Sequence, residues 1–202
     1  MVIDKNDSEL IALIVAGDTA AFEKVYNRYA GHALAFAISM ITEHSIAEEI
    51  VQEAFWRVWK RSTSFNAQRG SFSTWLLGIV HHLVIDELRR RRGQAPLASD
   101  DLDSDIIGSL PADDPDIMEQ VEAGMQRARI HEALEELSDS QRVVIELAFF
   151  QGYTHQEIAS KLQEPIGTIH TRARLALTKL RIPYERSYGA GAKPNQKVRV
   201  AA

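Results

Sequence analysis

The sequence predicts an all-α protein in which two small helical domains are joined by a flexible acidic linker. Apolar residues recur at helical spacing along most of the 202 residues, and no stretch alternates as a half-buried strand does. Residues 93–117 carry seven acidic side chains, no basic ones and three prolines, a composition typical of a solvated linker. We therefore expect one domain over residues 1–92, a second over 118–182, and a flexible basic tail over 183–202.

Composition excludes several kinds of chemistry. The chain has no cysteine, which rules out disulfides, thiolate zinc sites and cysteine redox sensing within it. It begins without a basic region followed by an apolar core, and no apolar run approaches the roughly 20 residues of a membrane-spanning helix. We expect a cytoplasmic protein that does not insert into membranes, with no metal, no cofactor and no catalytic residue.

The distribution of charge restricts how the chain could bind nucleic acid. A net charge of −5 does not suit a protein that binds DNA over its whole surface, so any DNA contact must come from local basic faces. Residues 1–53 hold nine acidic and three basic side chains, whereas residues 54–92 hold two and eight. The two halves of the first domain are therefore expected to meet different partners.

Capping boxes mark where several helices are expected to begin. In each box a Ser, Thr or Asp accepts a hydrogen bond from a first-turn amide, and an acid or amide three residues later reaches back. The four boxes lie at residues 45–48, 116–119, 138–141 and 154–157.

One helix of the first domain is predicted to have an apolar and an acidic face. Apolar residues between Ile46 and Trp59 recur at helical spacing and form the buried stripe. The opposite face is either an ordinary solvated surface or a docking surface, and an exposed Trp56 in its middle favours docking. We call it the acidic face, and its members are Glu48, Glu49, Gln52, Glu53 and Trp56.

A second helix, from about residue 72 to 92, follows a turn-rich segment over residues 62–70. It ends in four successive arginines, 89–92, which point around a full turn and so cannot all form internal salt bridges. Favourable charge at a helix C-terminus accounts for one or two of them, and phosphate contact is the better explanation of four. The residues expected to face inward are Trp75, Leu76, Ile79 and Leu83.

The second domain is predicted to contain a helix-turn-helix. A long amphipathic stretch and a helix near residues 141–151 precede a compact pair, with helices over 154–162 and 167–181 and a turn between them. Small polar groups and arginines on the outer face of the last helix suit base edges and phosphates respectively. Its buried stripe is Ile169, Ala173, Ala176 and Leu180, and its outward row is Thr171, Arg174, Leu175 and Thr178, flanked by His170 and Arg172.

Four short segments, at residues 47–55, 72–77, 86–92 and 165–169, stand in an order and at a spacing that resemble the extracytoplasmic-function (ECF) sigma factors of the sigma-70 family. The resemblance implies an alternative sigma factor, which directs core RNA polymerase to specific promoters for transcription initiation and is not an enzyme. The first domain would bind the clamp helices of the polymerase β′ subunit and melt the −10 element of promoter DNA. The second would read the −35 element beside the β flap, and an anti-sigma factor would control the whole protein.

The resemblance also assigns site residues, and the contact with core polymerase falls on the acidic face. A loop before the second helix matches the segment that captures a flipped base, which needs stacking and amide groups. The −10 residues are Phe65, Asn66, Gln68 and Arg69 in this loop, and His82, Asp86, Arg89, Arg90, Arg91 and Arg92 on the helix. The −35 residues are Thr168, His170, Thr171, Arg172, Arg174, Leu175 and Thr178.

The sequence departs from the family pattern in three respects. His82 stands where many members have Asn, and Leu175 and Leu177 stand where an arginine is common. Gln163 stands where the turn usually has Gly, so it must adopt a left-handed conformation unless the turn is built differently. Leu175 either touches a thymine methyl group or anchors an inhibitory partner.

Two other functions compete with the sigma-factor interpretation. A stand-alone helix-turn-helix regulator would bind DNA without polymerase, whereas a sigma factor is expected to bind promoters poorly by itself. A metal hydrolase would use His81, His82 and Asp86, but no further His or acid cluster completes such a site in the sequence.

Overall fold

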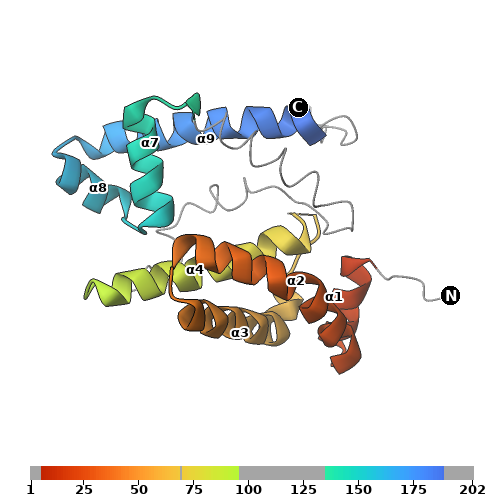
Figure 1. The fold of residues 1–202 in the computed structure, drawn as a ribbon. Coiled ribbons are helices and arrows are strands. Elements are labelled where there is room, and N and C mark those ends of the chain that lie inside the picture. The colour runs from red at the N-terminus through yellow and green to blue at the C-terminus, as the bar shows by residue number, and fades with distance from the viewer. Residues whose placement is uncertain (1–5, 69, 96–134, 189–202) are drawn as a thin grey trace, which may run out of the picture.

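The described part of the chain is helical throughout and forms two stacked units (Figure 1). The computed structural model describes residues 6–68, 70–95 and 135–188, with side chains up to residue 180. The first unit contains α1 (Asp7–Val15), α2 (Thr19–Met40), α3 (His44–Arg61), the 3-10 helix η1 (Ser62–Ser64) and α4 (Phe72–Arg91). The second contains α7 (Asp139–Ile145), the π-helical turn η2 (Glu146–Phe150), α8 (His155–Leu162) and α9 (Ile166–Tyr188). The predicted fold class, all-α with two helical domains, is confirmed.

The first unit is held by a core of aromatic and aliphatic side chains from α1 to α4. Tyr29 of α2 packs against Phe72 of α4 with ring centroids 5.0 Å apart, and both rings are buried together with Phe55 of α3. The Tyr29 hydroxyl donates to Asp7, which also pairs with Arg28 at 2.8 Å and so ties α1 to α2. This core fixes α3 and α4, the two helices on which the predicted polymerase and −10 residues lie.

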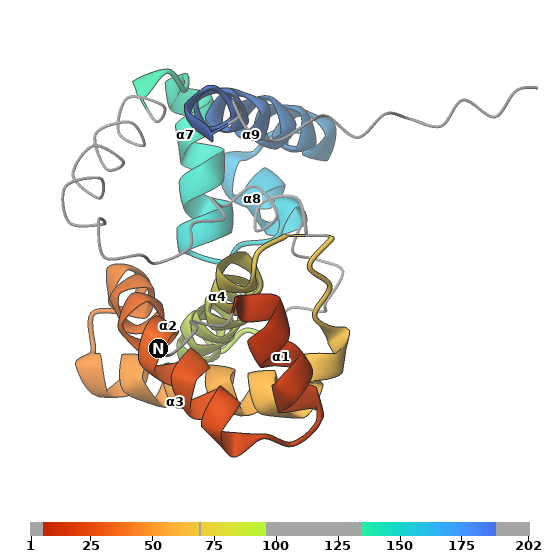
Figure 2. The same ribbon diagram turned by 90° about the vertical axis from the view of Figure 1, so that its right-hand side faces the viewer.

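The second unit has a smaller core between α7, α8 and α9, which includes the fully buried side chains of Val144, Ile158 and Ile169. α7 and α8 begin at capping boxes headed by Ser138 and Thr154, as the sequence predicted. Both views show that α7 and α8 lie over α4 of the first unit (Figures 1 and 2). The helix-turn-helix therefore packs next to the helix that ends in the arginine run.

The turn between α8 and α9 is built on a left-handed residue. Gln163 has φ 55° and ψ 40°, and its backbone N–H donates to the carbonyl of Ala159. This confirms that Gln163 takes the conformation for which glycine is usual, at a steric cost of about 1 kcal/mol. The departure from the family pattern therefore leaves the turn itself intact.

Two helix boundaries differ from the predictions. α3 begins at His44 and not after a capping Ser45. The residue at its N-cap, Glu43, forms no side-chain capping bond and pairs with Arg91. α9 continues to Tyr188, so residues 183–188, predicted as the start of a flexible tail, are helical. Pro183 has no backbone N–H, so the helix lacks one hydrogen bond there, and α9 nevertheless continues to Tyr188.

Several predictions fall on residues outside those that the structure describes. These are most of the linker, residues 96–117, the amphipathic stretch before residue 135, the tail from residue 189, the capping box at 116–119, and Arg69. Within the described ranges, no helix is both long enough and apolar enough to cross a membrane.

Candidate nucleic-acid interface

The acidic face lies on α3 and is open to solvent. All five of its members, Glu48, Glu49, Gln52, Glu53 and Trp56, are exposed. Trp56 keeps 55% of its surface accessible, and Lys60 Nζ lies 4.6 Å from the centre of the indole ring. The Glu53 carboxylate pairs with Arg57 at 2.8 Å. An exposed indole flanked by carboxylates suits a partner surface that offers both basic and apolar groups.

The loop between η1 and α4 is anchored by Phe65. Its half-buried ring lies 5.5 Å from the Trp75 ring and 5.9 Å from the Phe72 ring. Asn66 and Gln68 are exposed, and Asn66 Oδ1 accepts a 2.9 Å hydrogen bond from the Gln68 amide. Phe65 therefore fixes the base of the loop, while the side-chain amide of Gln68 faces solvent.

His82 and Asp86 lie along the middle of α4, and both are half-buried. The Nδ1 atom of His82 is 2.7 Å from the carbonyl oxygen of Gly78, one turn earlier in the helix. One ring nitrogen is thus held by the helix itself, and only Nε2 remains for another partner.

Arg90 and Arg91 form ion pairs on the surface of the first unit. Arg90 pairs with Glu87 at 2.7 Å, and Arg91 pairs with Glu87 at 2.8 Å and with Glu43 at 2.7 Å. Burial would raise the pKa of the Glu87 carboxyl, but the hydrogen bonds from Arg91 and Arg90 outweigh it and lower this pKa below its ordinary value. The Arg91–Glu43 pair is exposed and contributes little free energy, so it exchanges readily for a phosphate contact, whereas the Glu87 side chain is only 13% exposed.

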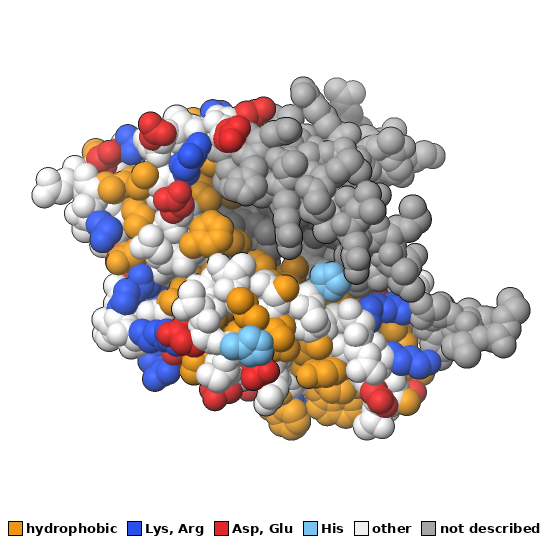
Figure 3. Space-filling view, in the orientation of Figure 1, with side chains coloured by type: hydrophobic (Ala, Val, Ile, Leu, Met, Phe, Trp, Pro, Cys, Tyr) orange, Lys and Arg blue, Asp and Glu red, His pale blue; other side chains and the backbone are white. Residues whose placement is uncertain are grey.

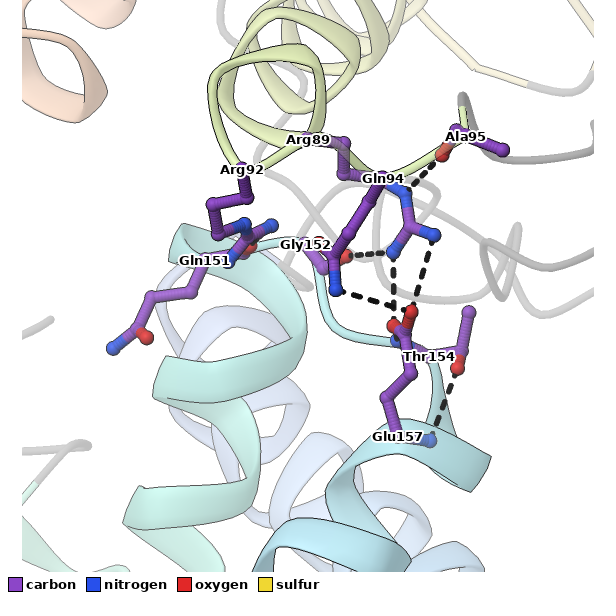
Figure 4. A network of polar contacts seen from close by, with 8 residues as sticks. All are labelled: Arg89, Arg92, Gln94, Ala95, Gln151, Gly152, Thr154 and Glu157. Atoms are coloured by element: carbon purple, nitrogen blue, oxygen red, sulfur yellow. Dashed lines mark hydrogen bonds and ion pairs between the residues drawn. The ribbon is translucent and has the colours of Figure 1, made fainter.

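Arg89 and Arg92 instead contact the second unit (Figure 4). The Arg89 guanidinium donates to the Gly152 carbonyl at 2.9 Å and pairs with Glu157 at 2.9 Å, and Arg92 donates to the Gln151 carbonyl. Three members of the arginine run thus form ion pairs in this structure and the fourth, Arg92, binds a carbonyl, while the phosphate contact stays a prediction. The spacing within α4 is consistent with Glu87 as the partner of Arg90 and Arg91. It could not reveal Gln151, Gly152 or Glu157, because these residues belong to the second unit.

The described −10 residues do not gather in one cluster. The loop residues precede α4 and the arginines end it, so about 30 Å of helix separates the two groups. Lys and Arg side chains collect at the left edge of the lower unit in Figure 3, where α4 ends in Figure 1. A surface of this length suits an extended polymer better than a small ligand.

The outward row on α9 is exposed as predicted, and it comprises Thr171, Arg174, Leu175 and Thr178. The stripe opposite it is buried, with Ile169, Ala173 and Ala176 each at 2% exposure or less. Leu175 is 41% exposed, although it is a large apolar residue. The second helix of the pair therefore presents mixed polar and apolar groups to an external partner.

The residues beside this row have partners within the second unit. Arg172 pairs with Glu164 at 2.7 Å, and the exposed His170 ring lies 4.8 Å from the His155 ring. Thr168 is half-buried. These three residues therefore border the row, and Arg174 is the exposed cation in its centre.

One group of residues that the structure brings together was not predicted from the sequence. Phe149, Gly152 and Glu157 of the second unit contact α4, and only the spacing of four between His81, Ile85 and Arg89 pointed to a further buried face on that helix. His81 Nε2 lies 2.9 Å from the Phe149 carbonyl oxygen, so it is not open to a metal. In the described ranges, no three His, Asp or Glu side chains are placed to hold a metal ion.

Comparisons with known proteins match both units to regions of the sigma-70 factors. Residues 25–94 match the family model for Sigma-70 region 2, and residues 127–180 match that for Sigma-70, region 4. The ECF RNA polymerase sigma factor RpoE of Cereibacter sphaeroides is 34% identical over 183 residues, which are 88% of this chain and 97% of the relative. The ECF RNA polymerase sigma factor SigK of Mycobacterium bovis is 32% identical, over 86% of this chain and 92% of the relative.

Among solved structures, Rhodobacter sphaeroides SigE in complex with the anti-sigma ChrR is 31% identical, with a TM-score of 0.45. The alignment covers 90% of this chain and 99% of that one. The alignment with RpoE covers 88% of this chain and 97% of that relative, and the two region models match in the expected order along the sequence. The chain belongs to the ECF sigma factors of the sigma-70 family.

Proposed function

We propose that residues 1–92 of this sigma factor bind core RNA polymerase and melt the −10 element, and that residues 118–182 read the −35 element. The observation that carries the proposal is the exposed row on α9, the second helix of a helix-turn-helix, whose opposite face is buried at Ile169, Ala173 and Ala176 and half-buried at Leu180. Such a helix fits the major groove and offers arginine and threonine to base edges. The protein needs no catalytic residue for this role, and it works in the cytoplasm.

On promoter DNA, the outward row of α9 contacts −35 bases, and its border of Thr168, His170 and Arg172 contacts the backbone. The −10 element runs along α4. Asn66, Gln68 and Arg69 hold a flipped base, while Phe65 anchors their loop by packing against Trp75. His82 and Asp86 line the path between this loop and the arginine run, which binds phosphates.

The acidic face of α3 binds the clamp helices of the β′ subunit. Glu49→Lys combined with Gln52→Ala is expected to lower the affinity for core polymerase about tenfold, because one change reverses a charge and the other removes an amide at the same contact. The free energy of unfolding should change by less than about 0.5 kcal/mol, since both side chains are exposed. Titration of labelled sigma factor with core polymerase measures the first quantity and urea unfolding the second.

The matched control is Glu23→Lys combined with Asn27→Ala, which makes the same charge reversal and amide loss at exposed positions of α2. It should bind core polymerase as the wild type does. Equal affinity of the α3 double variant and the wild type would refute the clamp assignment.

The function itself is tested by transcription from genomic fragments. Core polymerase with this protein is expected to start specifically at a set of promoters at which neither component starts alone. A stand-alone regulator would instead bind its promoters at nanomolar concentration and physiological salt without polymerase. Such binding, without any gain in specific initiation by core polymerase, would refute the sigma-factor assignment in favour of the regulator.

An anti-sigma factor controls this activity. The support is the exposed Leu175 at the centre of the DNA-facing row, which gives an apolar anchor to a partner that would block DNA by covering the same surface. When no such partner is bound, the Leu175 side chain is free to contact a thymine methyl group. Because the chain has no cysteine, any thiol-based sensing belongs to the partner.

A further inference from the structure

The loop between η1 and α4 is supported by α1, a helix outside the part of the chain that matches Sigma-70 region 2. α1 packs against η1, the 3-10 turn that leads into the loop, and both views place α1 beside the segment that joins α3 to α4 (Figures 1 and 2). Leu10, Ile11 and Ile14 of α1 are each 4% exposed or less and belong to the core against which Phe65 of the loop packs. The region 2 match begins at residue 25, so it does not account for this support.

Tyr29 of α2 joins α1 to the other end of the loop. Its hydroxyl donates to the Asp7 carboxylate in the first turn of α1, and Asp7 also accepts a 2.8 Å hydrogen bond from Arg28. The Tyr29 ring lies 5.0 Å from the ring of Phe72, the first residue of α4, and the Phe72 ring lies 5.9 Å from that of Phe65. One side chain thus connects the helix that packs on η1 with the residue at which α4 begins.

The polar contact between α1 and α2 is largely removed from solvent. Tyr29 is 1% exposed, and the side chains of Asp7 and Arg28 are 17% and 19% exposed. A phenylalanine would bury the same ring without a hydroxyl, and a charged pair at this depth adds little stability, because removing its groups from water offsets much of their attraction. Directional hydrogen bonds do hold two groups in one orientation. The contact therefore fixes how α1 lies on α2 and, through the neighbouring rings, how the loop is held.

We propose that Asp7 and Tyr29 are positioning residues for the loop between η1 and α4, acting through the ring contacts and through the packing of α1 on η1. The inference rests on the proposed function, because it concerns the loop that holds a flipped base of the −10 element. A loop that becomes ordered only on binding loses that free energy from its affinity, so Asn66 and Gln68 select a base best when the loop is already fixed. Neither Asp7 nor Tyr29 contacts DNA itself.

Two variants interrupt the contact from different helices, and each has a matched control. Tyr29→Phe removes the hydroxyl and keeps the ring that packs on Phe72. Its control is Tyr26→Phe, which makes the same change three residues earlier in α2, at a side chain that is 38% exposed. Asp7→Ala breaks the contact from α1, and its control is Glu9→Ala, which also removes an acidic side chain from the first turn of that helix. A folding defect in one variant therefore does not decide the result.

Hydrogen exchange in the free, full-length protein measures how firmly the loop is held. Amide exchange over residues 62–68 should rise about fivefold in Tyr29→Phe and in Asp7→Ala, because local opening of this segment then costs less free energy. Tyr26→Phe and Glu9→Ala should exchange at the parent rate. Exchange over residues 62–68 that stays at the parent rate in both Tyr29→Phe and Asp7→Ala would overturn the proposal, as would an equal rise in the controls.

Base preference at the −10 element measures what the contact does for recognition. The probes are duplexes with an opened −10 element, taken from promoters at which the parent protein starts transcription with core polymerase. Polymerase carrying Tyr29→Phe should discriminate among bases at the flipped position about fivefold less than the parent, with unchanged affinity of the sigma factor for core polymerase and for a −35 duplex. In a Gln68→Ala background, Tyr29→Phe should cause little further loss, because both changes act on the same loop.

A purely structural role for Tyr29 would lower the binding of every duplex to the same degree. Such a uniform loss, or a full additional loss in the Gln68→Ala background, would overturn the proposal. Unchanged discrimination by Tyr29→Phe, in a parent protein that does direct specific transcription, would overturn it as well. The proposed function fails by a different result, namely absence of specific transcription with core polymerase in the parent and in every variant, so the two failures are distinguishable.

Discussion

Arg174→Ala is expected to weaken recognition of the −35 element by about 1–3 kcal/mol. Arg174 is exposed in the centre of the outward row of α9, between Thr171 and Thr178, whose hydroxyls each donate to a carbonyl of their own helix. The arginine is therefore the charged group best placed to leave the helix surface and reach a base edge. Its planar guanidinium can bind the two major-groove acceptors of a guanine at once.

The measurement is the binding of polymerase carrying this sigma factor to promoter duplexes in which each −35 base is changed in turn. Loss of preference at one position, with little change elsewhere, identifies Arg174 as a base-reading residue. A uniform loss of affinity for all promoter sequences would indicate a phosphate contact instead. Unchanged affinity would show that Arg174 does not contact the DNA.

The control is Lys161→Ala, which removes a cation from α8, the first helix of the pair. Lys161 is exposed, and its Nζ lies 5.1 Å from the centre of the Tyr153 ring. Because this lysine lies outside the outward row of α9, its loss should leave the base preference unchanged. A similar change in preference for both variants would indicate a general effect of charge.

The buried and exposed faces of α9 follow from the spacing of the apolar residues along that helix, so they could be predicted from the sequence. Apolar residues at intervals of three and four place Ile169, Ala173 and Ala176 on one side, and the structure buries all three. For the turn before α9, the sequence left two possibilities, a left-handed Gln163 or a differently built turn, and the structure has the first of them. Both features depend on contacts within a few residues.

The faces of α4 could not be predicted in the same way. Trp75, Ile79 and Leu83 were expected to face inward and are only half-buried, whereas His81 is almost completely buried. The group that covers His81 is Phe149, 68 residues further along the chain. Periodicity shows that a helix has a row of residues, but it does not show which distant segment packs on it.

Acidification is expected to weaken the contact between the two units by up to about 3 kcal/mol, through the protonation of His81. Burial lowers the pKa of His81 from its ordinary 6.5 to about 4, an effect that the hydrogen bond to the Phe149 carbonyl opposes and that the neighbouring His82 reinforces. Nδ1 of His81 is buried without a hydrogen-bond partner, so an added proton there would find no acceptor. The closed protein, in which the two units are in contact through His81 and Phe149, therefore holds this ring neutral, whereas an open protein, in which the units are apart, does not.

The direction of this pH dependence follows from the lowered pKa of His81. The contact has its full strength above about pH 6.5, where His81 is neutral in both states, and it weakens as the pH falls, because the open state binds a proton that the closed state excludes. The loss is complete near pH 4. Glu157 stays ionised over most of this window, since its pKa lies below the ordinary value of 4.5, so the early part of the change belongs to His81.

The pH dependence is measured by energy transfer between dyes on Asn27→Cys in the first unit and Ser160→Cys in the second, both exposed positions in a chain without cysteine, and by NMR titration of the imidazole groups. The open fraction should rise between pH 6.5 and 5 in the parent protein. His81→Gln, which retains a side-chain donor for the Phe149 carbonyl, should remove this rise, whereas His82→Gln should retain it. An imidazole of His81 that titrates near pH 6.5 in the closed protein would contradict its burial against Phe149, because only a solvated ring binds a proton so readily.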